Sequence, residues 1–387
     1  MMSRVSKREL LAELRPRYQK AGQAEKQRIL DELVATTGYH RKYAIQVLNH
    51  APSAPSRPRR GKPTYDGRVV AALEQCWHAA NGICGKRLVP VLPEYVTALE
   101  RHGELVLDDQ TRPLLLRLSP ATADRLLARA RARTRPHGLT TTKPGTLLKH
   151  MIPVRTFADW DDARPGFTEV DLVAHCGDST RGEYLNSLNM VDVKTRWNEF
   201  VPLLNRGQAV VVAGIDQCRQ RLPYALLGLD SDNGSEFIND HLRRYCEQRQ
   251  ITFTRGRPYQ KNDQAYIEQK NWTAIRQTVG YDRYEGPAAC AALAAVYEPR
   301  RLYINFFQPV MVLVRKERVG AKVKRSYDQA TTPYQRVLDA PEVADAVKQR
   351  LQQQYLTLNP AELLRTIERR LTELWKLADK PAAVPMA

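Results

Sequence analysis

The sequence lacks any long uninterrupted apolar stretch. It contains no run of about 18 apolar residues, the length that a helix needs to span a bilayer. The N-terminal segment MMSRVSKRELLAEL has charged residues throughout, so it also lacks the continuous apolar core of a secretory signal peptide. These two absences predict a soluble, cytoplasmic protein with no membrane partner.

Closely spaced cysteine pairs are also missing. The six cysteines stand singly along the chain, so neither a disulfide framework nor a Cys-x-x-Cys zinc site has support. The nearest approach to a metal cluster is Cys76, His78 and Cys84, which is one ligand short of a tetrahedral structural site. We interpret these three side chains as buried or incidental.

Acidic residues are in short supply relative to basic ones. The chain has 60 Lys and Arg residues against 42 Asp and Glu residues, which gives a formal net charge of +18. Such a charge indicates a polyanionic partner, because Lys and Arg that neutralise phosphates release condensed counterions. With no membrane segment available, nucleic acid is the favoured partner.

A chain of 387 residues exceeds what one hydrophobic core usually serves, so several domains are expected. Residues 1–50 have helical periodicity, interrupted at Thr37-Gly38, and Arg41 and Lys42 open the second helical segment. This arrangement favours a DNA-binding helix-turn-helix. A plain helical hairpin with a solvated basic face is the alternative.

Residues 51–65 follow as a proline-rich basic linker. Its prolines prevent regular structure, and a linker of this charge could lie along a DNA groove or remain solvated. Its basic residues are Arg57, Arg59, Arg60 and Lys62. Residues 66–150 then return to helical patterning as a second, DNA-binding helical region. The segment LSPATADRLLARARARTR there is either a recognition helix or a solvated arginine-rich face.

The periodicity changes from 3.6 to 2 near residue 150, which predicts an α/β core at 151–300 with a mixed five-stranded sheet. The expected strands are 167–175, 184–195, 198–204, 224–231 and 251–255, with helices from 208, 236 and 263.

Two smaller elements are expected after this core. A small basic β element lies at 301–340 and C-terminal helices at 341–387. The apolar stripe of the last helix suits packing or self-association.

Three acidic residues are predicted to meet in the core. Asp171 lies in the first strand, Asp232 follows the fourth, and Glu268 is on the helix after the fifth, with thirty-five residues between the last two. Carboxylates brought together repel one another unless a cation neutralises them. Mg²⁺ prefers such oxygen ligands and bridges naturally to phosphates. The acids therefore predict a metal site within a basic protein.

The blocks EVDLVAH, DSDNGSEF and KNDQAYIEQKN resemble the integrase catalytic core, the ribonuclease-H-like domain shared by retroviral integrases and DDE transposases of bacterial insertion sequences. The resemblance extends over roughly residues 165 to 340. It implies that Asp171, Asp232 and Glu268 hold two Mg²⁺ or Mn²⁺ ions, one activating the attacking water or 3′-hydroxyl and the other stabilising the leaving oxygen. It also implies a bacterial, nucleoid-associated transposase that cuts and joins double-stranded DNA, at element ends and target, as a homo-oligomer.

Other residues near the three acids are assigned supporting roles. We expect Asp230 and Asp192 to be supporting or structural, and His175 and Asp178 to be loop residues. Substrate phosphates are expected to meet four basic residues on and before the catalytic helix: Arg255, Arg257, Lys261 and Lys270.

A purely structural interpretation remains open for each of the predicted catalytic acids. Asp232 could simply cap a helix and Glu268 could be solvated. For the whole chain, the alternatives are a catalytically inactive DNA-binding regulator that retains the fold, or a nuclease of the same fold.

Overall fold

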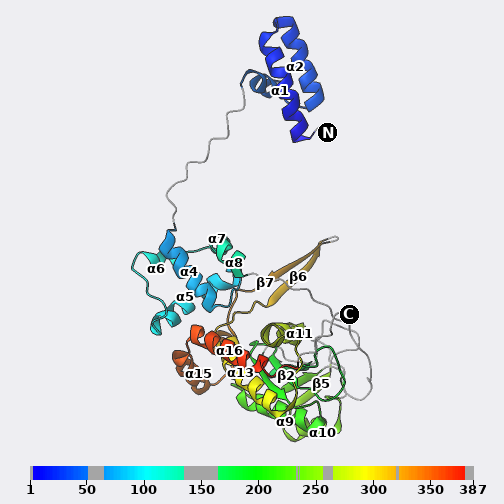
Figure 1. Ribbon diagram of the computed structural model, residues 1–387, viewed down its shortest axis with the longest axis vertical. Coiled ribbons are helices and arrows are strands. Elements are labelled where there is room, and N and C mark those ends of the chain that lie inside the picture. Colours follow the sequence, from blue (N-terminus) through cyan, green and yellow to red (C-terminus); the bar gives the residue numbers. More distant parts are fainter. Residues whose placement is uncertain are drawn as a thin grey trace, which may run out of the picture. The chain divides into compact units, whose positions relative to one another are not determined.

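The computed structural model forms two compact units, Met1–Thr64 and Tyr65–Ala387, each described here by itself (Figure 1). The residues described are 3–50, 65–134, 164–231, 234, 236–255, 265–319 and 322–379. The predicted linker residues Arg57, Arg59, Arg60 and Lys62 lie outside them.

The first unit is a bundle of α1 (Arg4–Lys20), α2 (Gln23–Thr37) and α3 (Arg41–Asn49). Gly38 has φ of 70° and ends α2 in the left-handed region that glycine adopts without strain. Its small core contains Tyr18, Ile29, Leu30, Leu33, Ala44 and Leu48. The helix break predicted at Thr37-Gly38 is therefore present.

The second unit begins with five helices. They are α4 (Gly67–Ala79), α5 (Gly85–Arg101), α6 (Thr111–Leu116), α7 (Pro120–Leu126) and α8 (Ala128–Thr134). Asp66 caps α4 and Ser119 caps α7 through side-chain hydrogen bonds. Their apolar side chains belong to the same core as the sheet that follows. Tyr95 of α5, for example, donates a hydrogen bond to the carbonyl of Phe307 at 3.0 Å.

A five-stranded sheet forms the centre of the second unit. Its strands are β1 (Phe167–Ala174), β2 (Asn186–Asp192), β3 (Asn198–Leu203), β4 (Gly228–Ser231) and β5 (Thr252–Arg255), in the order β3-β2-β1-β4-β5. The β1, β2 and β3 pairs are antiparallel, and β4 pairs in parallel with both β1 and β5. This confirms the mixed five-stranded sheet expected from the sequence.

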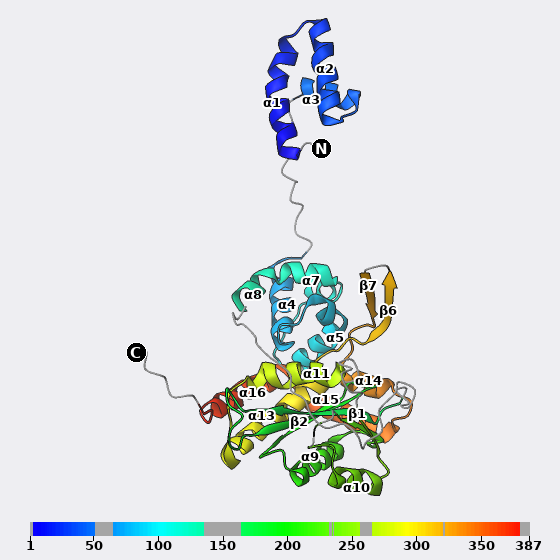
Figure 2. The same cartoon turned by 90° about the vertical axis from the view of Figure 1, so that its right-hand side faces the viewer.

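Helices cover both faces of the sheet. Figure 2 shows α9 (Gln208–Arg221) and α10 (Asp240–Gln248) on one side. On the other side lie α11 (Ala265–Lys270), the π-helix η1 (Asn271–Arg276), α12 (Gln277–Val279) and α13 (Gly286–Phe306). Gly214 lets α9 approach closely, because a Cβ atom there would lie 2.7 Å from Leu203 Cδ2.

The C-terminal part comprises a β-hairpin and three helices. They are β6 (Leu313–Val319), β7 (Lys322–Tyr327), α14 (Pro333–Asp339), α15 (Asp345–Thr357) and α16 (Pro360–Trp375). The apolar stripe of α16 packs inside this unit, since Ile367, Leu371 and Leu374 are buried. Most of the stripe is thus used for folding. Among the described residues, no helix combines the length and the apolar character that crossing a bilayer requires.

Candidate active site

Asp171 lies in the middle of the sheet. Its strand β1 pairs on one side with β2, where Asn189 is its direct partner, and on the other side with β4. The register of β1 and β4 is described as far as the pair Val170 and Ser231, which immediately precede Asp171 and Asp232 in the sequence. Asp232 itself lies outside the described residues, as do Arg257 and Lys261.

Both carboxylate oxygens of Asp171 accept hydrogen bonds. Oδ1 accepts from the backbone N–H of Leu172 at 2.7 Å, and Oδ2 accepts from Nδ2 of Asn271 at 2.6 Å. These bonds fix the direction of the carboxylate.

Asn271 is the first member of a row of hydrogen-bonded amides, which we call the asparagine chain: Asn271, Asn189 and Asn198. Asn189 Nδ2 donates to Asn271 Oδ1 at 2.8 Å, and Asn198 Nδ2 donates to Asn189 Oδ1 at 2.7 Å. Each amide of the asparagine chain therefore donates its hydrogen bond in the direction of Asp171. A carboxylate oxygen can only accept, so this direction suits the Asp171 end of the chain.

The inner end of the asparagine chain is anchored to the core. Asn305 of α13 accepts a hydrogen bond from the backbone N–H of Asn198 at 2.8 Å and donates one to its carbonyl at 2.9 Å. Asn189, Asn198 and Asn305 are all buried. The position of Asp171 is thus linked through side chains to four other elements: η1, β2, β3 and α13.

Glu268 lies on α11, above the same region of the sheet. It is exposed, and Asn271 follows it by three residues, so the two side chains share one face of the helical segment. The backbone N–H of Ile267 donates to Glu169 Oε2 of β1 at 2.9 Å, which holds the helix over the strand. The π-helix η1 begins at Asn271, and such turns are frequent at functional sites.

The other two acids near the site, Asp192 and Asp230, form hydrogen bonds that stabilise the sheet. Asp192 is buried and accepts hydrogen bonds from Gly166, Lys194 and Thr195. Burial raises the pKa of Asp192, while those hydrogen bonds act in the opposite direction. Asp192 pairs with Thr168, three residues from Asp171. Asp230 is also buried and accepts from Thr254 at 2.7 Å. Both therefore stabilise the sheet.

His175 was expected in a loop, but it is buried in the core directly after β1. Its Nε2 lies 2.7 Å from Ser187 Oγ, and Ser187 in turn contacts the hydroxyl of Tyr297. Burial lowers the pKa of His175 to about 3, with a further contribution from the positive charge of Arg276. The side chain is therefore neutral. Asp178 is exposed beyond the strand.

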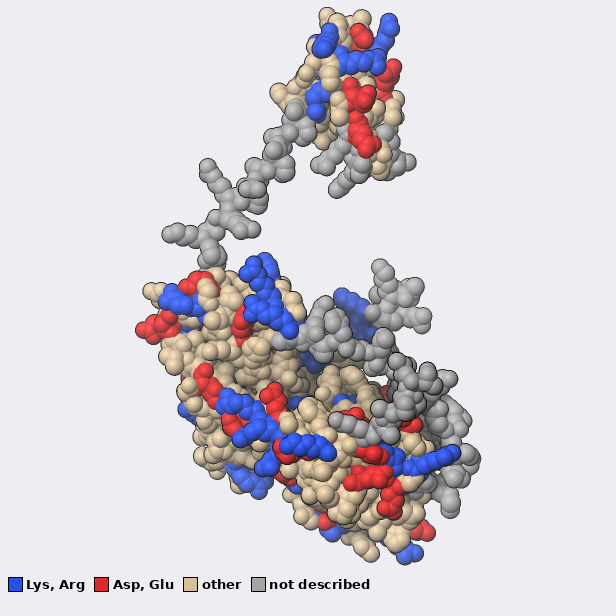
Figure 3. Space-filling view, viewed as in Figure 1, with Lys and Arg blue, Asp and Glu red and all other residues tan. Residues whose placement is uncertain are grey.

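The basic residues predicted to contact DNA lie in different environments. Arg41 pairs with Asp31 at the start of α3, and Lys42 beside it is exposed. Arg255 and Lys270, which the sequence predicts to contact substrate phosphates, are only 5% and 6% exposed. An exposed basic surface lies over α7 and α8, where Figure 3 shows basic side chains gathered. The exposed arginines of these two helices are Arg125, Arg129 and Arg133.

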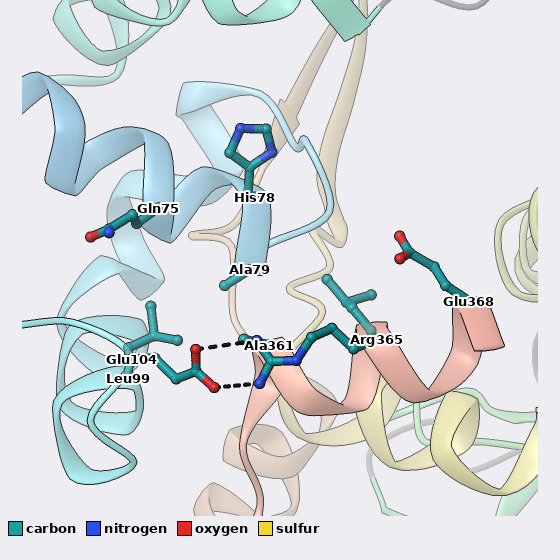
Figure 4. A pocket seen from close by; sticks show the side chains of 9 residues that line it. Gln75, His78, Ala79, Leu99, Glu104, Ala361, Arg365 and Glu368 are labelled. Carbon is teal, nitrogen blue, oxygen red and sulfur yellow. Dashed lines mark hydrogen bonds and ion pairs between the residues drawn. The ribbon is translucent and has the colours of Figure 1, made fainter.

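A separate cavity of about 360 Å³ lies between α4, α5 and α16 (Figure 4). Glu104 and Arg365 form an ion pair across it, and hydrogen bonds from Arg365 and Asn359 lower the pKa of Glu104 to about 2. His78 and Glu368 also line it. None of the predicted catalytic residues does so, and its strongest charges neutralise each other.

The candidate metal ligands of the site are identified partly from the sequence and partly from the hydrogen bonds of the structure. No group of three or more His, Cys, Asp or Glu side chains arranged for a metal ion occurs among the described residues, which exclude Asp232. Asp171 offers a carboxylate whose direction is fixed by hydrogen bonds, and Glu268 offers an exposed carboxylate on the adjoining helix. Oxygen donors of this kind suit Mg²⁺ or Mn²⁺.

Sequence reasoning did not identify Asn271, Asn189 or Glu169 as parts of the site. Asn271 could have been found from its spacing of three residues after Glu268 on a helix. Asn189 carried a weaker signal, a polar residue in the middle of a strand whose every residue is buried. Its contact with Asn271 depends on the packing of α11 against the sheet.

Residues 161–261 match the family model of the integrase core domain. The catalytic core domain of BIV integrase shares 21% identity, with a TM-score of 0.31 over 45% of this chain and 94% of that one. The HTLV-2 integrase catalytic core domain, solved in complex with magnesium, shares 14% identity, with a TM-score of 0.25 over 30% of this chain and 70% of that one.

The second unit therefore contains an integrase-type catalytic core of the ribonuclease-H-like class, a domain of DNA-processing integrases and transposases. The uncharacterized protein y4rM of Sinorhizobium fredii is 42% identical over 335 residues, which are 87% of this chain and 96% of that protein. The chain belongs to the same family as y4rM.

Proposed function

We propose that the protein is a transposase that binds the ends of an insertion sequence, cleaves DNA strands there and joins them to target DNA. Asp171, Asp232 and Glu268 are the catalytic residues in this proposal. The observation that carries it is the fixed Asp171 carboxylate, hydrogen-bonded to Asn271 on the helical segment that also bears Glu268.

The same three acids would hold two Mg²⁺ or Mn²⁺ ions. When bound, the metals supply Lewis-acid activation of the attacking hydroxyl and stabilisation of the leaving oxygen in an in-line displacement at phosphorus. The donor chemistry supports this assignment, because both carboxylate oxygens of Asp171 accept hydrogen bonds from N–H donors and are thereby held in one direction. Asp232 enters the proposal on the sequence pattern alone.

The residues of this chain would contribute mainly by positioning. The asparagine chain restrains Asp171, and Glu169 holds the N-terminal end of α11 against β1. Such restraint lowers the cost of bringing the reacting groups into line. Attack of water on the phosphodiester at the element end breaks its bond to the 3′-oxygen and leaves a 3′-hydroxyl. This hydroxyl then attacks a phosphodiester of the target and displaces the 3′-oxygen of the cut target strand, so no covalent enzyme intermediate is required.

Recognition of DNA is assigned to the helical parts. The three-helix unit with Arg41 and Lys42, and the exposed arginines of α7 and α8, are the proposed contacts outside the core. Arg57, Arg59, Arg60, Lys62, Arg255, Arg257, Lys261 and Lys270 complete the proposed set. Because two element ends must be processed together, the working form is proposed to be a homo-oligomer on DNA in the bacterial nucleoid.

The test is incubation of the full-length protein with Mg²⁺ or Mn²⁺ and duplexes carrying the sequences that flank its gene. Nicked and joined products are both expected, and both should disappear with Asp232→Asn. The matched control is Asp178→Asn, an equal charge change at an exposed residue beyond β1. Absence of any product with an authentic end would contradict the proposal.

The same assay separates the alternative functions. A nuclease of the same fold would give cleavage without strand transfer. A DNA-binding regulator would bind the ends without metal-dependent products, and Asp232→Asn would leave that binding unchanged.

A further inference from the structure

Three buried cations gather around the helical segment that bears Glu268. We call them the cation cluster: Arg196 in the turn between β2 and β3, Lys270 at the end of α11, and Arg300 of α13. They are 6%, 6% and 3% exposed. Basic side chains are rarely buried to this extent unless they are paired.

Direct contacts hold both arginines against the segment that carries Lys270. The Arg196 guanidinium lies 3.4 Å from the centroid of the Tyr266 ring, and Tyr266 precedes Lys270 by one helical turn. Arg300 Nη2 donates to the carbonyl of Thr273 at 2.8 Å. The two arginines thus approach the same short segment from the sheet and from α13.

The guanidinium of Arg196 is not satisfied by the protein. Its Nη1 is buried and has no hydrogen-bond partner. Its backbone has φ of 66°, a left-handed conformation that a residue other than glycine adopts at some cost. A strained, buried donor without an acceptor is unusual in a folded protein and often marks a functional position.

The positive charges of the cation cluster are only partly compensated, because the charge of Arg196 acts on the buried Asp192 carboxylate and opposes the rise in its pKa that burial causes. None of its members forms an ion pair with a carboxylate in the part of the chain that the structure describes.

Gathered cations of this kind need an anion. A guanidinium fork stacked on an aromatic ring, together with an ammonium group, matches the oxygens of a phosphate better than a single carboxylate. An anion with several oxygens could accept from Arg196 Nη1 and offset the repulsion within the cluster.

We propose that the cation cluster binds one backbone phosphate of the substrate nucleic acid, beside the catalytic helix and separate from the carboxylates. The identity of this anion rests on the proposed function. The free protein retains the repulsion, and DNA binding relieves it. Arg196 is the principal donor, and the site unites the β2–β3 turn, α11 and α13.

The test measures binding to a duplex of arbitrary sequence in EDTA, because a backbone phosphate carries no sequence information and no cleavage can then occur. Arg196→Gln is compared with Arg206→Gln, an equal charge change at an exposed arginine after β3. Loss of a charge-assisted hydrogen bond predicts at least a roughly 10-fold weaker affinity for Arg196→Gln than for Arg206→Gln. Arg196→Lys should lose less, because it keeps the charge.

Thermal unfolding provides a second readout that does not depend on DNA. Inorganic pyrophosphate should raise the Tm of the wild type relative to chloride at equal ionic strength, and Arg196→Gln should lose this rise. If Arg196→Gln does not fold, Lys270→Gln takes its place with the same expectations. Equal DNA affinity of the Arg196 and Arg206 variants, or equal Tm shifts in wild type and variant, would overturn the phosphate site.

Failure of this inference is distinguishable from failure of the proposed function. A protein that binds DNA through Arg196 but yields no strand products with metal retains the phosphate site and loses the transposase assignment. If the Arg196→Gln variant binds, cuts and joins DNA as well as the wild type, the transposase assignment stands and the phosphate site is lost.

Discussion

Asn271 donates a hydrogen bond from Nδ2 to Oδ2 of Asp171 over 2.6 Å, although the two residues are 100 positions apart in the sequence. The bond joins the central strand of the sheet to the helical segment that bears Glu268. Glu268 and Asn271 lie one turn apart on that segment. The Asn271–Asp171 hydrogen bond therefore helps to set the distance between the predicted catalytic acids Asp171 and Glu268. The geometry of the site therefore depends on an amide as well as on carboxylates.

The asparagine chain should control the metal dependence of the reaction. Asn189→Leu removes the donor that orients Asn271, so Asp171 is less well restrained. We expect the metal concentration for half-maximal strand cleavage to rise by about 10-fold or more, as for other groups that orient metal ligands. The measurement is a Mg²⁺ titration of the cleavage rate.

A matched control for this prediction is Asn186→Leu. Asn186 is buried in the same strand, but its Nδ2 donates to the carbonyl of Tyr184, outside the asparagine chain. Both variants should lose stability by roughly 1 to 3 kcal/mol, because buried partners are left unsatisfied. Only Asn189→Leu should change the metal requirement; an equal change in both would contradict the positioning role.

Removal of the Asp171 charge should abolish catalysis without abolishing DNA binding. Asp171→Asn is expected to lower the rate of strand cleavage by about 10³-fold or more, as removal of a catalytic group typically does. Affinity for a duplex of arbitrary sequence should stay within about 3-fold of wild type, because phosphate contacts dominate binding. Substantial residual cleavage by the variant would show that Asp171 has no catalytic role.

The buried pair of Glu199 and Arg301 should be important for folding. Arg301 Nη2 donates to Glu199 Oε1 at 2.9 Å, and the carboxylate is fully buried, where Trp197 Nε1 also donates to it at 2.8 Å. Arg301→Met leaves an unpaired carboxylate and should reduce the free energy of unfolding by about 3 to 5 kcal/mol. Urea denaturation measures this loss.

Replacing the carboxylate as well should recover part of that stability. The double variant Glu199→Gln/Arg301→Met has no buried charge to leave unpaired, so it should be more stable than Arg301→Met alone. A double variant as unstable as the single one would assign the loss to packing around Arg301.

His175 should make stability dependent on pH on the acid side of neutrality. Burial, together with the positive charge of Arg276, lowers its pKa to about 3, against about 6.5 in an unfolded chain. Between these values the unfolded state binds more protons, so stability rises with pH and is lost as pH falls through this window. The loss should approach about 1.4 kcal/mol per pH unit well below 6.5.

The variant His175→Asn lacks this titration. It should be less stable than the wild type at pH 7.5, since Ser187 loses its partner, and the difference should narrow at pH 5. Unfolding free energies from urea denaturation at both pH values test this, and a difference that stays constant with pH would mean that His175 is accessible to protons in the folded protein.

The strands, most helices and the order of the core elements could be predicted from the sequence because local patterns dictate them. Alternation of apolar residues marked β1, β2 and β3, and Gly38 marked the end of α2. The spacing of Asp171, Asp232 and Glu268 identified candidate acids for the same reason, since each stands at a recognisable place relative to a strand, turn or helix. These signals need only neighbours in the chain.

What the sequence could not reveal are contacts between residues that pack from distant elements. Asn271 reaches Asp171, and Arg196 reaches Tyr266, only because α11 and η1 lie across the sheet. Nor could charge counting show that Lys270 is buried while Arg125, Arg129 and Arg133 are exposed. Local periodicity fixes which elements form, whereas burial and hydrogen-bond partners follow from packing, so only the tertiary structure decided which polar side chains orient the site.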